Sequence, residues 1–126
     1  MSECIFCHID PERIITENDT CVAVYDQFPV SEGHVLILTK AHRETLFMCT
    51  PEEQLGILDM IQKVKKIIQE KYHPNGYNIG VNIGAAAGQT IRHCHIHIIP
   101  RYLGDMKDPR GGVRGVIPGK QNYCIK

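Results

Sequence analysis

Polar and apolar residues alternate along the stretch 91–102, which reads IRHCHIHIIPRY. Three histidines occupy one set of alternate positions and three apolar residues the other: His93, His95 and His97 against Cys94, Ile96 and Ile98. A period of two is typical of a β-strand, whose successive side chains point to opposite faces. The pattern predicts three imidazoles on one face, with neighbours about 6.5 Å apart, and an opposite face that meets the core. Pro100 is predicted to end the pairing, because proline has no N–H to donate.

One long helix is predicted to begin after Cys49. Thr50 is a suitable N-cap, Pro51 suits the first helical position, and Glu53 completes a capping box. Apolar residues then recur every three or four positions, as on the buried face of an amphipathic helix: Leu55, Leu58, Ile61, Val64 and Ile68, with Ile57, Met60 and Ile67 widening the stripe. The sequence PNG at 74–76 predicts that the helix ends near Tyr72.

Shorter runs predict the remaining strands. Residues 13–16 and 20–25 read as two strands of a hairpin around the turn Asn18-Asp19. Residues 34–39 are almost all apolar, as in a strand buried on both faces, and residues 77–82 alternate weakly. A short helical turn is predicted within 44–48.

Composition excludes some classes of partner. A chain of 126 residues with 43% hydrophobic and 22% charged residues is an ordinary soluble single domain. The net charge is zero with histidine neutral, so no overall field recruits nucleic acid or an anionic membrane. No apolar run approaches the ~20 residues of a membrane span, and the N-terminus does not read as a signal peptide, so we expect a cytoplasmic protein.

Cysteine spacing suggests a metal site. Of the six cysteines, Cys4 and Cys7 form a C-x-x-C pair, which favours metal or redox chemistry over disulfides when no secretory signal precedes it. A thioredoxin-like pair opens a helix, whereas this one precedes Pro11 and no helical pattern. A metal site is therefore favoured over redox chemistry.

The histidine stretch is a candidate catalytic site, since imidazole can be both nucleophile and proton shuttle near neutral pH. The alternative is a polar sheet face with solvated histidines. His34, at the start of the apolar strand, either joins this site or is a histidine satisfied at a strand end. The loop 84–88 (GAAAG) would let backbone N–H groups approach a phosphate. Neither G-x-G-x-x-G nor a Walker sequence is present, so dinucleotide-binding and P-loop mechanisms are not supported.

Residues 1–103 are predicted to form the domain, followed by a Gly/Pro-rich tail at 104–126 without periodicity. The tail is either a partly disordered terminus or a segment that packs on the domain or on a dimer partner, as a flap or a strap that uses Arg110 and Arg114.

The stretch GQTIRHCHIHIIPR resembles the signature of the histidine triad family of nucleotide hydrolases and transferases. Further blocks are similar to that family: VYD at 24–26, GHVLILTKAH at 33–42 and NIGAAAGQT at 82–90. The tail is similar to that of some microbial members, and the cysteines suggest a zinc-bearing type. This resemblance implies an α+β domain with an antiparallel sheet of about five strands, one long helix and a short one, which pairs as a homodimer.

The resemblance also implies an enzyme that binds purine nucleotides and needs no organic cofactor. Such enzymes attack the α-phosphorus of phosphoramidates, of acyl or lysyl adenylates, or of diadenosine polyphosphates. His95 would be the nucleophile, with its second ring nitrogen bonded to a strand carbonyl, and His97 would donate to the phosphate or leaving group. His34 would support them.

The resemblance extends to binding residues. Asp26 would accept the ribose hydroxyls, and Asn82, Gly88, Gln89 and Thr90 would join His95 and His97 around the phosphate. Ile5, Phe6 and Phe28 either sandwich the base or pack in the core. Cys4, Cys7, His42 and His93 would hold a structural zinc ion.

Two other functions stay open. One is a non-catalytic nucleotide-binding or scaffold protein of the same fold. The other is a zinc-dependent hydrolase with the metal on His93, His95 and His97, but the outer two would lie about 13 Å apart along a strand, too far for one ion.

Overall fold

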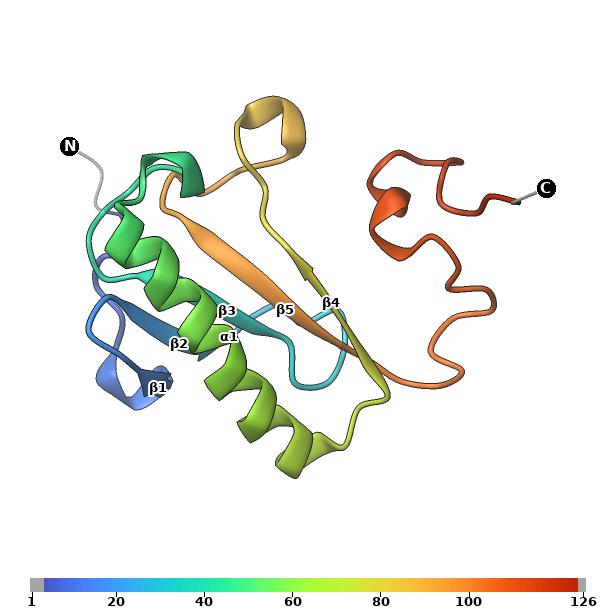
Figure 1. Cartoon of the computed structure of the whole chain (residues 1–126), viewed down its shortest axis with the longest axis horizontal. Helices are drawn as coiled ribbons and strands as arrows, with labels where there is room; N and C mark the ends of the chain where they lie inside the picture. Colours follow the sequence, from blue (N-terminus) through green and yellow to red (C-terminus); the bar gives the residue numbers. More distant parts are fainter. Residues whose placement is uncertain (1–3, 125–126) are drawn as a thin grey trace.

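A computed structural model of the chain describes residues 4–124. Five strands form one antiparallel sheet in the order β1-β2-β3-β5-β4 (Figure 1). The strands are β1 (Ile14–Glu17), β2 (Cys21–Tyr25), β3 (Val35–Thr39), β4 (Gly76–Gly80) and β5 (His95–Arg101). One long helix, α1, and a short 3-10 turn, η2 (Leu46–Met48), complete the predicted α+β arrangement. Among the described residues, no helix is both long and apolar enough to span a membrane.

Helix α1 spans Pro51–Tyr72 and begins as predicted. The Glu53 N–H donates to Thr50 Oγ1 at 3.1 Å, and the Thr50 N–H donates to Glu53 Oε1 at 2.8 Å. This reciprocal capping box satisfies donors that the first turn leaves without helical partners. The helix ends where His73 adopts a left-handed conformation, with φ of 54°.

The buried face of α1 differs from the predicted one. Leu55 and Leu58 are 68% and 61% exposed, whereas Ile57 and Met60 are 5% and 0% exposed and pack in the core. Val64 and Ile68 are buried as predicted. The apolar stripe is wider than the area that one sheet can cover, and tertiary packing selects which part of it is buried.

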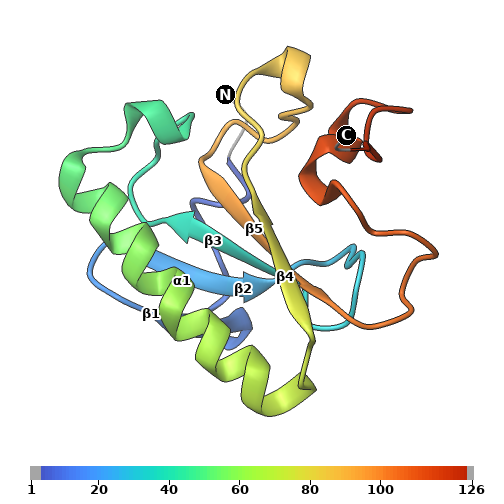
Figure 2. The same ribbon diagram turned by 45° about the vertical axis from the view of Figure 1, so that its right-hand side comes forward.

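The two faces of the sheet contact different parts of the molecule. Helix α1 crosses one face, as Figure 2 shows, and meets the core side chains of Ala23, Ile37 and Ile96. His95 pairs with Leu38 and His97 with Leu36, and these leucines belong to a smaller cluster on the face away from α1. The histidine face is therefore opposite the helix.

Two details of the histidine strand were predicted incorrectly. Strand β5 begins at His95, so His93 precedes the strand. It also continues through Pro100, which pairs with Tyr77 of β4. The pairing of β3 with β5 ends at Ile98, and beyond it the Pro100 carbonyl accepts a hydrogen bond from Ser31 Oγ at 2.7 Å. The missing N–H of proline thus lies on the side where no strand requires it.

The tail lies on the β4 side of the sheet (orange to red in Figure 1). It contains a 3-10 helix, η4 (Gly112–Val116), next to β4. Asn122 Nδ2 donates to the Arg110 carbonyl at 3.1 Å, and the Arg114 guanidinium lies 4.8 Å from the Tyr123 ring centre. Packing on a dimer partner stays a prediction.

Candidate functional site

His95 lies at the start of β5 with its ring held by the backbone. Its Nδ1 lies 2.7 Å from the carbonyl oxygen of His93. A carbonyl oxygen can only accept, so the hydrogen of a neutral His95 ring is on Nδ1 and the lone pair is on Nε2. The side chain is 7% exposed. This is the arrangement that a nucleophilic imidazole requires.

His97 follows on the same face and contacts His34 from the start of β3. The distance from His34 Nε2 to His97 Nδ1 is 3.0 Å. The other ring nitrogen of His34, Nδ1, accepts the Val30 N–H at 3.2 Å. The sequence therefore identified His34 as a neighbour of the site, whereas the role of Val30 has no sequence signal, because its contribution is a backbone amide.

Burial keeps this histidine pair neutral. It lowers the pKa of His34, against an opposing effect of the Asp26 carboxylate. Burial also lowers the pKa of His97, with further lowering from His95 and His34 and an opposing effect of Asp26. Removal from water penalises the charged form of an imidazole. Near neutral pH, both rings are therefore in the uncharged form.

Asp26 lies beside the histidines, at the end of β2. Its Oδ2 is 3.4 Å from His34 Nε2 and 3.9 Å from His97 Nδ1. Its Oδ1 accepts the Phe28 N–H at 2.7 Å. The sequence predicted a ribose contact for this carboxylate, and the structure adds an electrostatic contact with the histidine pair.

The loop between β4 and β5 is shaped by Gln89. Its Oε1 accepts the Gly84 N–H at 2.9 Å, and its Nε2 donates to the carbonyls of Glu44 and Ile91 at 2.6 and 3.1 Å. Gly88 has φ of 91°, a conformation that favours glycine. The Gln89 amide is thus used to hold the loop, and the backbone N–H groups of Ala87, Gly88 and Gln89 donate to carbonyl groups of the same loop at 3.0–3.1 Å.

The other predicted binding residues differ in how far they are buried. Asn82 is half-buried and Thr90 is exposed at the two ends of the same loop. The Phe6 ring lies edge-on to the His95 ring, with centres 5.2 Å apart, and packs on the apolar cluster beneath the site. Ile5 and Phe28 are 61% and 84% exposed. Phe6 is therefore part of the wall of the site, and the two exposed side chains are not core residues.

A second group of side chains has the composition of a zinc site. The ligand atoms of Cys4, Cys7, His42 and His93 lie within 4.8 Å of one another. Cys4 Sγ is 3.3 Å from His93 Nδ1, and Cys7 Sγ is 3.1 Å from His42 Nδ1. His93 Nε2 lies 2.7 Å from the carbonyl oxygen of Thr39, so the hydrogen is on Nε2 and the lone pair of Nδ1 faces the sulfurs. Two thiolates and two imidazoles fit a tetrahedral structural zinc ion.

The three alternate histidines do not converge on one ion. His93 groups with the cysteines, and His97 groups with His34 and Asp26. His95 belongs to neither group among residues 4–124. This separation argues against a catalytic metal held by all three histidines.

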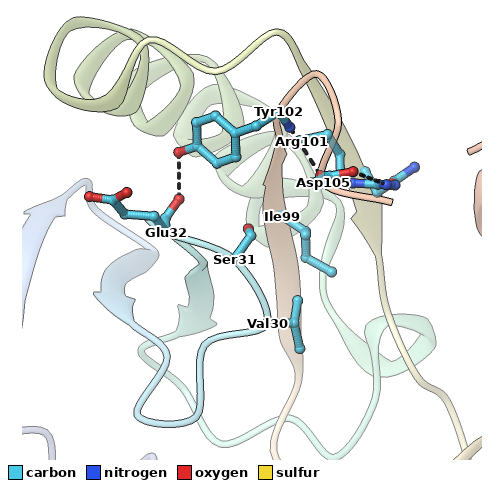
Figure 3. Close-up of a pocket in the computed structure, with 8 residues that line it drawn as sticks. Val30, Ser31, Glu32, Ile99, Arg101, Tyr102 and Asp105 are labelled. Atoms are coloured by element: carbon cyan, nitrogen blue, oxygen red, sulfur yellow. Dashed lines mark hydrogen bonds and ion pairs between the residues drawn. The ribbon is translucent and has the colours of Figure 1, made fainter. Parts of the chain in front are cut away.

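A cavity of about 520 Å³ extends the histidine face beyond His97. Ile99 and Arg101 line it from β5, and the loop before His34 forms its other wall (Figure 3). Arg101 forms an ion pair with Asp105 at 2.8 Å, and the Tyr102 hydroxyl donates to the Glu32 carbonyl at 2.6 Å. None of the candidate catalytic histidines lines this cavity.

Comparison with known proteins identifies a matching family and similar relatives. The HIT domain family matches residues 9–104. The adenylylsulfatase HINT3 of Arabidopsis thaliana is 38% identical over 79% of this chain and 53% of its own length. The chain thus spans about half the length of that relative.

Two solved structures are also similar. A zinc-bound histidine triad family protein of Mycobacterium smegmatis has a TM-score of 0.74 and 34% identity, covering 84% of this chain and 83% of that one. A diadenosine triphosphate hydrolase of Plasmodium falciparum has a TM-score of 0.73 and 26% identity, covering 79% of this chain and 68% of that one.

Proposed function

The chain belongs to the HIT domain family, and on this premise we propose that it hydrolyses a purine nucleotide conjugate at the α-phosphorus. The observation that carries this proposal is the 2.7 Å contact between His95 Nδ1 and the His93 carbonyl, which leaves the lone pair of a neutral His95 ring on Nε2. The relatives named adenylylsulfatase and diadenosine triphosphate hydrolase act on nucleotides, which supports the substrate class.

The proposed reaction has two steps. His95 Nε2 forms a bond to the α-phosphorus while the bond to the leaving group breaks, and the leaving atom receives a hydrogen through His97 or from solvent. Water then attacks the nucleotidyl-histidine and gives its proton to His97 or to solvent, the bond from phosphorus to His95 Nε2 breaks, and the nucleoside monophosphate leaves. In this proposal Asp26 accepts the ribose hydroxyls, and the loop that contains Gly88, Asn82 and Thr90 surrounds the phosphate.

Zinc has a structural role in this proposal. Cys4, Cys7, His42 and His93 would hold the ion, which would tie the N-terminal segment to the chain just before β5. A zinc-bound family member among the similar structures supports this assignment. The chemistry that zinc supplies there is cross-linking of the chain, since all four ligand positions come from the protein.

A substrate panel tests the proposed function. We expect nucleoside monophosphate release from at least one of adenosine phosphoramidate, lysyl adenylate, diadenosine triphosphate and diadenosine tetraphosphate, with a nucleotidyl-histidine adduct in the quenched enzyme. The measurement is product chromatography together with intact-protein mass. Tight nucleotide binding without turnover of any compound would instead support the non-catalytic scaffold.

We also propose that the protein is a homodimer paired through β4 and the adjoining part of α1. Strand β4 is an edge strand, and edges left unpaired are normally covered. An apolar groove beside it is lined by Phe47, Leu58 and Ile79, which are 80%, 61% and 44% exposed. A second copy placed on this groove would bury these side chains around a two-fold axis.

Light scattering tests the dimer. We expect twice the 14.2 kDa chain mass at micromolar concentration. Leu58→Glu should shift the protein toward monomer, because it places a charge in the interface. Leu103→Glu is the matched control, since Leu103 is 86% exposed and lies outside the groove. A monomeric wild type, or a Leu58→Glu variant that remains dimeric, would contradict this interface.

A further inference from the structure

We propose that Arg43 and Glu53 are positioning residues, whose ion pair ties the start of β5, and with it His95, to helix α1. The pair acts through the backbone of Arg43, whose carbonyl accepts a hydrogen bond from the residue just before β5. This inference rests on the proposed function for its kinetic consequence only. Its structural part, the anchoring of one backbone amide, can be measured without any substrate.

The start of β5 is held by a hydrogen bond outside the sheet. The ladder between β3 and β5 reaches only as far as the pair of Leu38 and His95. Cys94 lies just beyond this ladder, and its N–H donates to the carbonyl of Arg43 at 2.6 Å. Cys94 also separates His95 from His93, whose carbonyl orients the His95 ring. The Arg43 carbonyl thus fixes the backbone at the point where the proposed nucleophile and its orienting group meet.

Arg43 lies on a segment outside regular secondary structure, because residues 42 and 43 belong to neither a helix nor a strand. Its side chain connects this segment to α1. Arg43 Nε lies 2.9 and 3.2 Å from the two carboxylate oxygens of Glu53, in the first turn of the helix. Hydrogen bonds between charged groups are about twice as strong as those between neutral groups. The ion pair therefore anchors the segment whose carbonyl holds Cys94.

Glu53 is buried and charged, so the pair is costly to break. Its side chain is 8% exposed, against 37% for Arg43. Burial raises the pKa of the Glu53 carboxyl, but hydrogen bonds from Thr50 and Arg43 and the charge of Arg43 outweigh this effect and lower the pKa below its ordinary value. The carboxylate is thus ionised at neutral pH. Without Arg43 it would be a buried charge with no cation beside it, which strongly disfavours the native geometry.

A second ion pair on the same segment provides an internal comparison. Glu44 Oε1 and Arg92 Nη1 lie 3.1 Å apart, and their side chains are 42% and 79% exposed. Exposed ion pairs contribute little, because water and salt screen the charges. This pair joins the segment directly to the chain before β5, whereas the buried pair joins it to α1. We therefore assign the positioning role to the buried pair.

Hydrogen exchange of the Cys94 amide tests the anchoring. The measurement is the protection of this amide relative to that of Ile37, which lies in the central strand β3, in zinc-loaded protein without substrate. The ratio separates local opening from unfolding of the whole sheet. Arg43→Met removes the donor and keeps a long side chain, and we expect it to lower the ratio by about tenfold, the value of one hydrogen bond. Arg92→Met, which removes the exposed pair, should leave the ratio unchanged.

Two further variants separate anchoring from stability. The double variant Arg43→Met, Glu53→Gln has no unpaired buried carboxylate, and glutamine is compatible with the capping box. It should regain part of the Tm that Arg43→Met loses, but not the protection ratio. Thr50→Ala loses the N-cap and some Tm but leaves the ion pair in place, so its ratio should equal that of the wild type. An unchanged ratio in the double variant, or an equal fall in Thr50→Ala, would overturn the inference whatever the activity of the protein.

Kinetics show whether the anchoring reaches the nucleophile. A displacement of about 1 Å at a reacting group can cost about 100-fold in rate. On the panel compound that the wild type cleaves fastest, kcat of the double variant should fall about tenfold or more, with little change in KM. Thr50→Ala and Arg92→Met should keep the wild-type kcat. A loss of kcat that follows Tm across all these variants would indicate a merely structural pair and contradict the inference. Absence of turnover in the wild type would refute the proposed function and leave the exchange result to decide this inference.

Discussion

Replacing His95 by alanine is expected to abolish turnover while nucleotide affinity changes by only a few fold. The variant removes the atom that forms the bond to phosphorus, and loss of a nucleophile costs about four orders of magnitude or more in rate. The measurements are single-turnover product formation and nucleotide binding by calorimetry.

Two further variants separate the roles of the neighbouring rings. His97→Ala should retain nucleotidyl-enzyme formation with good leaving groups and lose about 10²–10⁴ in rate with poor ones. His95→Gly should regain part of its activity when imidazole is added, because free imidazole can occupy the space left by the missing ring and act as the nucleophile. If His95→Ala keeps most of the wild-type rate on every substrate, the assignment of the nucleophile is wrong, and a metal-dependent hydrolase becomes the leading alternative.

Removing both thiols of the zinc group is expected to have the largest effect on stability. The protein as purified should contain one zinc ion per chain, and the double variant Cys4→Ser, Cys7→Ser should contain none. Ligand sites do not form in the unfolded chain, so zinc adds several kcal/mol of stability, and its loss should lower the Tm by about 10 °C or more. Elemental analysis and thermal unfolding are the measurements.

The matched control is Cys124→Ser, which changes an exposed thiol outside the zinc group. We also expect the double variant to lose turnover, although the two cysteines have no assigned role in substrate binding. The His93 carbonyl holds His95, and Phe6, between the two cysteines, packs against the His95 ring. Wild-type protein free of zinc, or a double variant with unchanged Tm, would contradict the structural zinc site.

The local elements of the fold could be predicted because their signals are local. The capping box of Thr50 and Glu53 and the sequence PNG at 74–76 predicted the two ends of α1, which spans Pro51–Tyr72. The period of two places His95 and His97 on one face. These features depend on spacing within one element, which the sequence contains in full.

Features that depend on a second element could not be predicted in the same way. Leu55 and Ile57 are equally apolar, and only contact with the sheet decides that Ile57 is buried. Strand β5 continues through Pro100 because β3 pairs with β5 only as far as Ile98, and beyond it only β4 is paired. Gln89 binds the Glu44 carbonyl, 45 residues away along the chain, so its use in holding the loop has no local signal.

The sequence by itself supplied the candidate side chains, since three alternate histidines predict a catalytic site and a C-x-x-C pair predicts a metal site by residue type and spacing. Only the tertiary structure decided which atoms face the two ring nitrogens of each histidine. A neutral imidazole carries one hydrogen, and its position depends on the atom that faces each ring nitrogen. For His93 that atom is the Thr39 carbonyl oxygen, for His95 the His93 carbonyl oxygen, and for His97 the Nε2 atom of His34. Two of these three partners are 54 and 63 residues distant in the chain, so folding had to bring them together before the three rings could differ.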